Sequence, residues 1–492
     1  MFRLRKATTR LLLVSVVVGS IVGCADFLDV NDNPNTATDV RMDLILPGVL
    51  VNFTQNILGF PTERYGSTTG LTSWATEWTQ QWSWNRDERP YSQFHHYEVS
   101  EGDADQPWNA AYANVMKNSL IIMQKASESG DWPYHGIAKF IFAWTLSIVT
   151  DAWGPVPYKQ AFDTRVYGPA YDSQQEVYEG VHQLIEEAIE EMRREGRTPT
   201  SNDLLYGGDM DAWIRLARTV QARLHLRLTY APGESAADRA QRALEALAEG
   251  FQSNADDADF EFPGGEGARS SLYEFENEGW EERNVASHYF VELLRGLNDP
   301  RLPIMIRPAL SDGAYRGHVN GSPGVPDSTV SKIGSYFTAD SSSINWMSYA
   351  EAKFIEAEAR LILAGPAAAD APYRAGIRAN MEKLGVAPAE IDSYLASLPN
   401  LASVANPLEA IITQKYIANF LKAEVWNDWR RTGYPVLEPV EGAVIAGIPQ
   451  RLRTPAGEMN YNSDNVAATG IPTGLEGMLV KVWWASGTGP TP

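Results

Sequence analysis

Tryptophans at a regular spacing of four residues are the first side chains in this sequence that could bind a ligand. On a helix, residues four apart lie on the same side, so Trp74, Trp78 and Trp82 would form one stripe, and Trp84 follows just beyond them. Exposed indole rings offer flat apolar faces on which sugar rings or aromatic side chains can stack. A buried row of the same rings would instead form a seam against a neighbouring helix, so both interpretations stay open. Four more candidates for the same ligand site are Tyr91, His95, Trp280 and Tyr315.

Histidines and acidic residues do not form a pattern that is typical of metal binding. His95 and His96 precede Asp103 and Asp105 in the sequence. Adjacent histidines point in different directions on most backbones, and this spacing matches neither a zinc site nor an EF-hand loop. We therefore expect no bound metal.

Three glutamates could be taken for the paired carboxylates of a glycoside hydrolase. On a helix, Glu351 and Glu358 would lie two turns apart on one face, whereas Glu356 would point elsewhere. We interpret them as ordinary helix charges or as buried caps of a neighbouring loop. The sequence also shows no Ser-His-Asp set, phosphate loop or nucleotide fingerprint, so we expect neither catalysis nor a cofactor.

The composition excludes some classes of partner. The 492 residues carry a formal charge of −21, which opposes nucleic-acid binding because no basic excess is available to neutralise phosphates. Hydrophobic residues make up 44% of the chain and charged residues 21%, as in a folded globular protein. The stock of 15 Trp and 21 Tyr supplies both core and ligand platforms.

The N-terminus has the order of an export signal that ends at the single cysteine. Arginines and a lysine precede the apolar run Leu11–Val18, which is too short to span a bilayer comfortably. Ile21-Val22-Gly23-Cys24 then resembles a bacterial lipobox, which implies removal of residues 1–23 and a lipid-modified Cys24. The alternatives are an ordinary signal peptide or an uncleaved anchor. Residues 24–39, rich in Asp, Asn and Thr, read as a tether.

From residue 40 onward the hydrophobic periodicity is mostly helical. Residues 210–250 and 348–384 each form a helix pair that looks like a degenerate tetratricopeptide hairpin, with Ala at close-packing positions. Residues 251–279 and 298–344 are rich in Gly, Pro, Ser and Asp and read as long loops. The expected helices span residues 43–59, 106–129, 136–150, 172–195, 210–229, 236–250, 348–364, 368–384 and 408–431.

Seven motifs in order resemble the SusD/RagB family of nutrient-binding outer-membrane lipoproteins. The most specific are Asp-Ala-Trp-Gly-Pro-Val-Pro-Tyr at 151–158 and Glu-Val-Trp-Asn-Asp-Trp-Arg-Arg-Thr-Gly-Tyr-Pro at 424–435. We interpret most motif residues as fold-holding, with Arg301 an ion-pair partner within the chain. The motifs lie at 151–158, 169–178, 299–303, 331–336, 349–359, 424–435 and 448–452.

The resemblance implies a fold, a location and a partner. It implies a mostly α-helical SusD-like body over residues 40–492, built as one domain on tetratricopeptide-type helix pairs with long irregular loops. It also implies a lipid-anchored protein at the surface of the outer membrane. Such a protein captures an oligosaccharide or peptide and delivers it to a SusC-like TonB-dependent transporter.

Two other classes of function remain as alternatives. A surface glycan hydrolase would need a carboxylate pair about 5–10 Å apart in a cleft. A protein-binding adaptor would need a concave tetratricopeptide groove and no small-ligand pocket. The capture function instead predicts an aromatic-lined depression on one face of the molecule.

Overall fold

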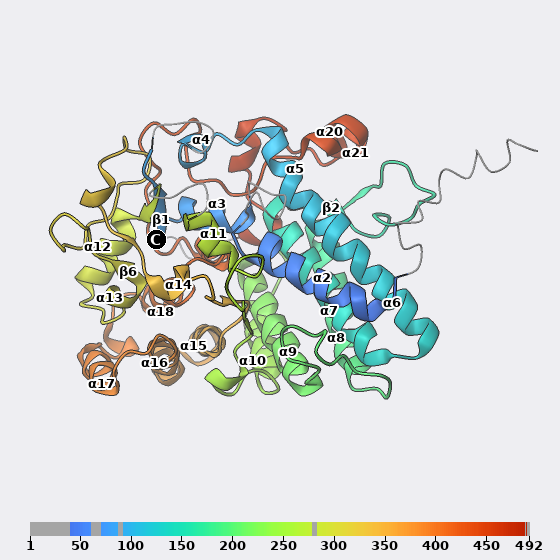
Figure 1. Ribbon diagram of the computed structural model, residues 1–492, viewed down its shortest axis with the longest axis horizontal. Helices are drawn as coiled ribbons and strands as arrows, with labels where there is room; N and C mark the ends of the chain where they lie inside the picture. The colour runs from blue at the N-terminus through green and yellow to red at the C-terminus, as the bar shows by residue number, and fades with distance from the viewer. Residues whose placement is uncertain (1–39, 61–69, 87–91, 278–282, 488, 490–492) are drawn as a thin grey trace, which may run out of the picture.

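The computed structural model describes residues 40–60, 70–86, 92–277, 283–487 and 489, and the chain there is mostly helical (Figure 1). None of these helices combines the length and the apolar character needed to cross a bilayer. The signal peptide at 1–23, Cys24, the tether, Tyr91 and Trp280 lie outside the described residues. The interpretations that concern them stay predictions.

Two of the expected N-terminal helices contain a stretch of wider, π-helical turns. The first runs as α2 (Met42–Asn52) into η1 (Phe53–Leu58). The second runs as α5 (Glu101–Asn109), η3 (Ala110–Met116) and α6 (Lys117–Ser129). Ser100 begins it with a capping box, because its hydroxyl accepts from the backbone of Asp103 and the Asp103 carboxylate accepts in return.

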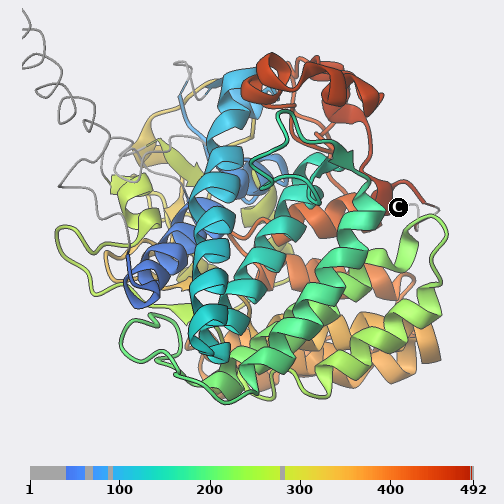
Figure 2. The ribbon, with the colours of Figure 1, turned by 90° about the vertical axis from the view of Figure 1, so that its right-hand side faces the viewer.

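The helices α7 (Trp132–Trp153) and α8 (Gln174–Met192) form a closely packed pair. Figure 2 shows them lying beside α6 in one slanted layer. A Cβ on Gly136 would lie 2.6 Å from Met192 Cγ and 2.7 Å from the Ala188 carbonyl oxygen, so only glycine allows this approach. Gly154, with φ +81°, ends α7, which runs three residues beyond the end expected at residue 150.

The expected tetratricopeptide-like pairs are present. They are α9 (Met210–Arg227) with α10 (Ala236–Leu247), and α15 (Tyr349–Ala364) with α16 (Pro366–Lys383). Because α10 also packs on α15, the two pairs continue as one row along the lower part of Figure 1. The prediction of a mostly α-helical body on degenerate helix pairs is confirmed.

The prediction of a single long helix at 408–431 is wrong. The structure has two helices, α18 (Pro407–Ala418) and α19 (Glu424–Thr432), joined by a short turn. Within that turn Leu421 adopts φ +62°, a left-handed conformation that cannot continue an α-helix. The Gln81 side chain accepts the Leu421 amide hydrogen at 2.7 Å and holds the turn in place.

Short elements complete the fold, and several of them lie within the segments 251–279 and 298–344 that were expected to be irregular loops. Antiparallel pairs join β1 (Trp82–Trp84) to β5 (Asn284–Ala286), β2 (Val156–Pro157) to β3 (Tyr171–Asp172), β4 (Asp259–Phe260) to β8 (Ile344–Asn345), and β6 (Ile306–Arg307) to β7 (Lys332–Ile333). The remaining α-helices are α3 (Leu71–Trp78), α4 (Ser92–His95), α11 (Ser271–Asn277), α12 (His288–Gly296), α13 (Leu302–Met305), α14 (Ser335–Thr338), α17 (Pro388–Ser397), α20 (Ala456–Tyr461) and α21 (Ser463–Ala468). Single 3-10 turns are η4 (Leu228–Tyr230), η5 (Asn254–Asp256), η6 (Asp327–Thr329), η7 (Leu401–Ser403), η8 (Leu475–Leu479) and η9 (Trp483–Ala485).

Candidate functional site

The tryptophan row does not form an exposed stripe on one helix. Trp74 and Trp78 belong to α3, but the helix ends there and Trp82 and Trp84 belong to strand β1. Each of the four rings is at most 3% exposed. The Trp78 indole donates to the carbonyl of Phe94 at 3.0 Å, as expected of a buried ring that satisfies its polar atom. The rings are therefore buried against their neighbours, and the prediction of an exposed stacking platform is wrong.

Three of these rings nevertheless border a small recess. Trp74, Trp82 and Trp84 line about 300 Å³ together with two phenylalanines, and Glu77 supplies a carboxylate to the same wall. The wall thus combines aromatic rings with two polar side chains, Glu77 and Ser73. Trp78 points away from it and packs edge-on against Trp426, with ring centroids 5.5 Å apart. The remaining lining residues are Ser73, Phe94 and Phe275.

His95 and Tyr315 lie next to this aromatic region. His95 is only 2% exposed, and its Nδ1 lies 3.2 Å from Glu77 Oε1 behind the recess. Tyr315 is half-buried and packs against the apolar cluster that contains Trp82 and Trp84. Tyr315 is therefore the described candidate ring that keeps the most accessible surface.

The residues considered for a metal site have separate structural roles. The His95 and His96 rings meet edge to face at 5.0 Å, and the Asp103 carboxylate caps α5. Asp105 accepts from the backbone of Gly457 at 2.9 Å. Within the part of the chain that the structure describes, no group of three or more metal-ligating side chains lies close enough to hold an ion.

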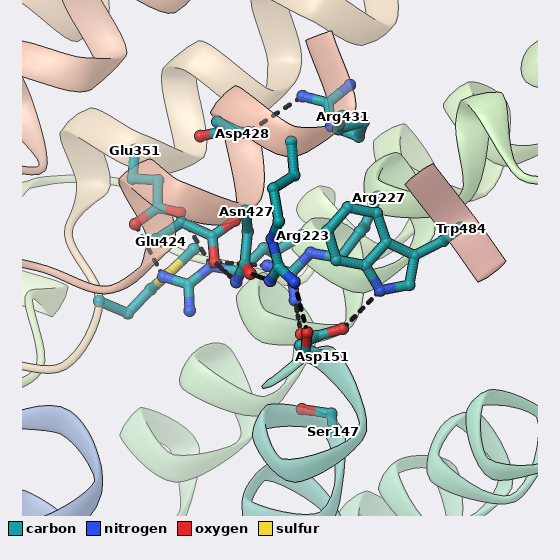
Figure 3. A network of polar contacts seen from close by, with 12 residues as sticks. Ser147, Asp151, Arg223, Arg227, Glu351, Glu424, Asn427, Asp428, Arg431 and Trp484 are labelled. Carbon is teal, nitrogen blue, oxygen red and sulfur yellow. Dashed lines mark hydrogen bonds and ion pairs between the residues drawn. The ribbon is translucent and has the colours of Figure 1, made fainter. Parts of the chain in front are cut away.

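The motif residues from distant parts of the chain meet in a buried ionic network (Figure 3). Asp151, at the end of α7, accepts from Arg227 of α9, from the Tyr178 hydroxyl at 2.5 Å and from the Trp484 indole at 2.8 Å. Arg227 also pairs with Glu424 of α19, and the Asp151 and Glu424 charges raise the pKa of this guanidinium well above its usual value despite burial. Four helices, α7, α8, α9 and α19, and the C-terminal turn are thus joined through two carboxylates.

The glutamates considered as a hydrolase pair belong to the same kind of network. Glu351 is fully buried and accepts two hydrogen bonds from Arg223, at 2.8 and 2.7 Å. Glu358 is equally buried and pairs with Arg431. Glu356 points elsewhere, toward Lys353 and Arg360 on the same helix. The expected orientation of the three side chains is confirmed, and each carboxylate is held by a cation.

The ion pair expected after Asp299-Pro300 is confirmed. Arg301 has no exposed surface and donates to both Asp299 carboxylate oxygens, at 2.9 and 2.6 Å. It also donates to Asn380 and Gln414, at 2.8 and 2.5 Å. Local sequence indicated the first partner, but the other two come from α16 and α18 and are 79 and 113 residues away. Only the tertiary fold brings them into contact.

Two further recesses adjoin each other and were not expected from sequence. The outer one, between α11, α14, α16 and α18, encloses about 810 Å³, part of it open to solvent. The inner one encloses about 620 Å³ and reaches the ionic network at Asp151 and Glu424. They share Leu58, Asn345 and Lys422, so Lys422 lies at their junction. No motif marks this lysine, which follows the unforeseen turn at Leu421.

Comparison with known proteins places this fold among described relatives. Residues 49–455 match the model of a SusD-like family described as "starch-binding associating with outer membrane". No curated protein matches the sequence.

Solved structures agree over most of the chain. A SusD/RagB family protein from Bacteroides thetaiotaomicron has a TM-score of 0.76 at 22% identity and covers 92% of this chain and 100% of its own. A chitin-binding protein has a TM-score of 0.77 at 25% identity, with 90% and 100% covered. A chitin-binding SusD homologue from Flavobacterium johnsoniae has a TM-score of 0.76 at 24% identity, with 90% and 99% covered.

Proposed function

This chain belongs to the SusD-like family, and from that premise we propose that it binds a saccharide at the outer-membrane surface and delivers it to a SusC-like TonB-dependent transporter. The single observation that carries the proposal is the family match over residues 49–455, which spans the helical body. The starch-binding description of that family and the similarity to chitin-binding proteins favour a glycan over a peptide as the ligand.

The proposed saccharide contact is the accessible ring of Tyr315 beside the aromatic recess. Trp74, Trp82 and Trp84 are at most 3% exposed, so they form the buried support of this region and do not offer stacking faces. Tyr315 adds an accessible ring on the same apolar cluster. Stacking on such a ring contributes on the order of 1 kcal/mol, so capture by this surface would be weak and reversible.

The engagement of the buried carboxylates supports binding without catalysis. Glu351 and Glu358 are each fixed by an arginine, and a hydrolase would need one carboxyl free to donate a proton and another free to attack or activate water. A lipid-modified Cys24 would tether the body at the membrane, since each buried methylene contributes about 0.8 kcal/mol. The engaged carboxylates favour a binding protein over an enzyme, and the tether would hold it at the membrane.

The test of delivery is recovery of the full lipoprotein from outer membranes, followed by mass spectrometry of the co-purifying proteins. We expect a TonB-dependent transporter at near-equal stoichiometry. Recovery of the protein alone, or with an unrelated partner, would contradict delivery and favour the adaptor alternative.

The test of saccharide binding uses the detergent-solubilised full chain and calorimetry with malto- and chito-oligosaccharides. We expect one series to bind, Tyr315→Ala to weaken it about tenfold, and Tyr461→Ala, which removes a 73% exposed ring elsewhere, to leave it unchanged. Release of reducing ends from either series would instead support a hydrolase.

A further inference from the structure

The inner recess is richer in positive charge than the protein as a whole. Its wall holds the acidic residues Asp151 and Glu424 but four basic ones, whereas the whole chain carries −21. Arg223 and Arg227 are each paired with a carboxylate. The two remaining bases, Lys422 and Arg430, have no carboxylate within ion-pair distance among the described residues.

Arg430 is held by neutral groups. Its guanidinium donates to the backbone carbonyls of Asp151 and Gln450, at 2.7 and 2.9 Å, and lies 3.5 Å above the Trp426 ring. Among the residues that the structure describes, none accepts a hydrogen bond from its Nε. Because these partners carry no negative charge, burial lowers the pKa of Arg430 to about 9. A buried cation with an unused donor is a suitable contact for an anionic ligand.

Lys422 is the second cation without a counter-ion. Its ammonium donates to the Asn345 side-chain oxygen, and the Asn345 amide group in turn donates to Asp259 at 2.8 Å and to the Met347 carbonyl at 3.0 Å. Asn345 is thereby fixed with its oxygen toward Lys422. An ammonium has three donors, and one such bond leaves capacity for a ligand. Lys383, nearby in the outer recess, is instead paired with Asp257 and Asp259.

The outer recess beside Lys422 is mainly apolar. Phe60, Leu272, Phe337 and Phe420 contribute to its wall, and Tyr336, 41% exposed, lies at its edge. The apolar part of this wall suits an alkyl or aryl body. Its polar side chains Asp259, Asn345 and Lys383 are bonded to one another or to Lys422. The combination of an apolar outer part with a cationic inner end defines the chemistry of the ligand.

We propose that the joined recesses bind a small amphipathic carboxylate, with its carboxylate at Lys422 and its apolar body against the phenylalanines of the outer recess. This site goes beyond the proposed saccharide function and is formed by different residues from the aromatic recess. Its ligand class is an alkyl or aryl carboxylic acid. A uronic acid shares the carboxylate but not the apolar body, so it should bind more weakly.

The first experiment measures binding of three probes to the full chain by calorimetry at pH 7. We expect hexanoate to bind, the neutral isostere hexanamide to bind at least tenfold more weakly, and glucuronate not to bind detectably. Equal binding of hexanoate and hexanamide would overturn the role of the charge. Tighter binding of glucuronate than of hexanoate would overturn the role of the apolar wall.

The second experiment tests the lysine itself. Lys422→Gln should abolish the preference for hexanoate over hexanamide, whereas Lys481→Gln, at an exposed position, should leave it unchanged. Thermal melting of each variant separates loss of binding from loss of fold. An unchanged preference in a folded Lys422→Gln protein would overturn the proposal.

The third experiment uses the titration of Lys422. Desolvation lowers the pKa of this lysine to about 8, with Glu351 and Asp257 opposing the shift and Lys383 and Arg223 adding to it. Hexanoate affinity should therefore fall between pH 7 and pH 10 as the ammonium loses its proton. Lys422→Arg keeps the charge at this position and should lose less hexanoate affinity over the same interval, since Arg430, with its pKa of about 9, still titrates there. A pH-independent affinity in the unmodified protein would contradict the assignment, and saccharide binding is scored separately with Tyr315→Ala.

Discussion

At the scale of single residues, Arg301 shows how completely a charge can be enclosed. Its guanidinium meets Asp299, Asn380 and Gln414 with no exposed surface. We expect Arg301→Met to destabilise the fold by about 3–5 kcal/mol, because Asp299 would remain buried without its counter-charge. Urea unfolding followed by circular dichroism measures this loss.

The matched control is an arginine in an exposed ion pair. Arg295 pairs with Glu292 at 2.8 Å on α12, and both side chains are mostly solvated. We expect Arg295→Met to change stability by less than about 1 kcal/mol. A loss below about 1 kcal/mol for Arg301→Met as well would show that solvent reaches the Asp299 site.

The sequence predicted residue chemistry where partners are close along the chain. Asp299 and Arg301 are two residues apart, so their ion pair followed from the motif. The burial of Trp82 and Trp84 could not be predicted from the local sequence. It depends on β5 and α11, about 200 residues later in the chain. Lys422 could not be identified from the sequence. What distinguishes it is that no carboxylate among the described residues lies within ion-pair distance, which only the fold determines.

At the scale of elements, the α7–α8 pair depends on Gly136. Gly136→Ala would place a methyl group 2.7 Å from the Ala188 carbonyl oxygen, which cannot move without displacing α8. We expect a loss of about 1–3 kcal/mol in thermal unfolding. Gly48, inside α2, has no atom within 4 Å of its added Cβ. Gly48→Ala should therefore stabilise the protein by about 0.5–1 kcal/mol, and equal effects at both sites would contradict the packing argument.

A stacked histidine pair makes the contact between α8 and α9 sensitive to acid. The His182 and His225 rings lie 4.0 Å apart and 9° from parallel, and Arg239 donates to Nδ1 of His225. Burial lowers the pKa of His182 to about 3, and burial together with the neighbouring positive groups lowers that of His225 further. Both rings are therefore neutral in the folded protein over the range in which an unfolded histidine gains a proton.

The sign of the effect follows from where the protons bind. Below about pH 6.5 the unfolded chain protonates both histidines and the folded chain does not, so stability falls as the pH decreases toward 4. Each histidine contributes up to about 1.4 kcal/mol per pH unit. Denaturant unfolding at pH 7 and pH 5 should show His182→Phe losing less stability than the unmodified protein. His288→Gln, at an exposed position, should follow the unmodified protein.

Helix boundaries were predictable where capping residues or glycines mark them, as at Ser173 before α8 and Gly154 after α7. The break between α18 and α19 was not. No glycine or proline marks it, and the left-handed Leu421 donates its amide hydrogen to Gln81, from a distant segment. Tertiary contacts overrode the local helical periodicity there.

At the scale of the whole molecule, Asp151 links the middle of the chain to its C-terminal part. Trp484 is fully buried and donates its indole hydrogen to Asp151 at 2.8 Å. We expect Trp484→Phe to cost about 1–3 kcal/mol, because a buried carboxylate oxygen loses a donor. Thermal unfolding measures it. Trp483→Phe, at a half-buried ring in the same turn, should cost less, and the reverse order would contradict the linking role.

The overall architecture could be predicted because helical periodicity and the seven motifs both extend along the chain. The recesses could not, because each is lined by residues from segments hundreds of positions apart, such as Leu58, Asn345 and Lys422.

The buried ionic network has an evolutionary consequence. Removing one member of a pair such as Glu358–Arg431 leaves its partner as an unpaired buried charge and destabilises the fold. Changing both members together to apolar residues can leave the stability nearly unchanged. These positions can therefore drift only in coordinated steps. Among homologous sequences, 151 with 227, 358 with 431, and 299 with 301 should covary as pairs. Such coupled inheritance would keep the motifs recognisable long after the surrounding surface has diverged.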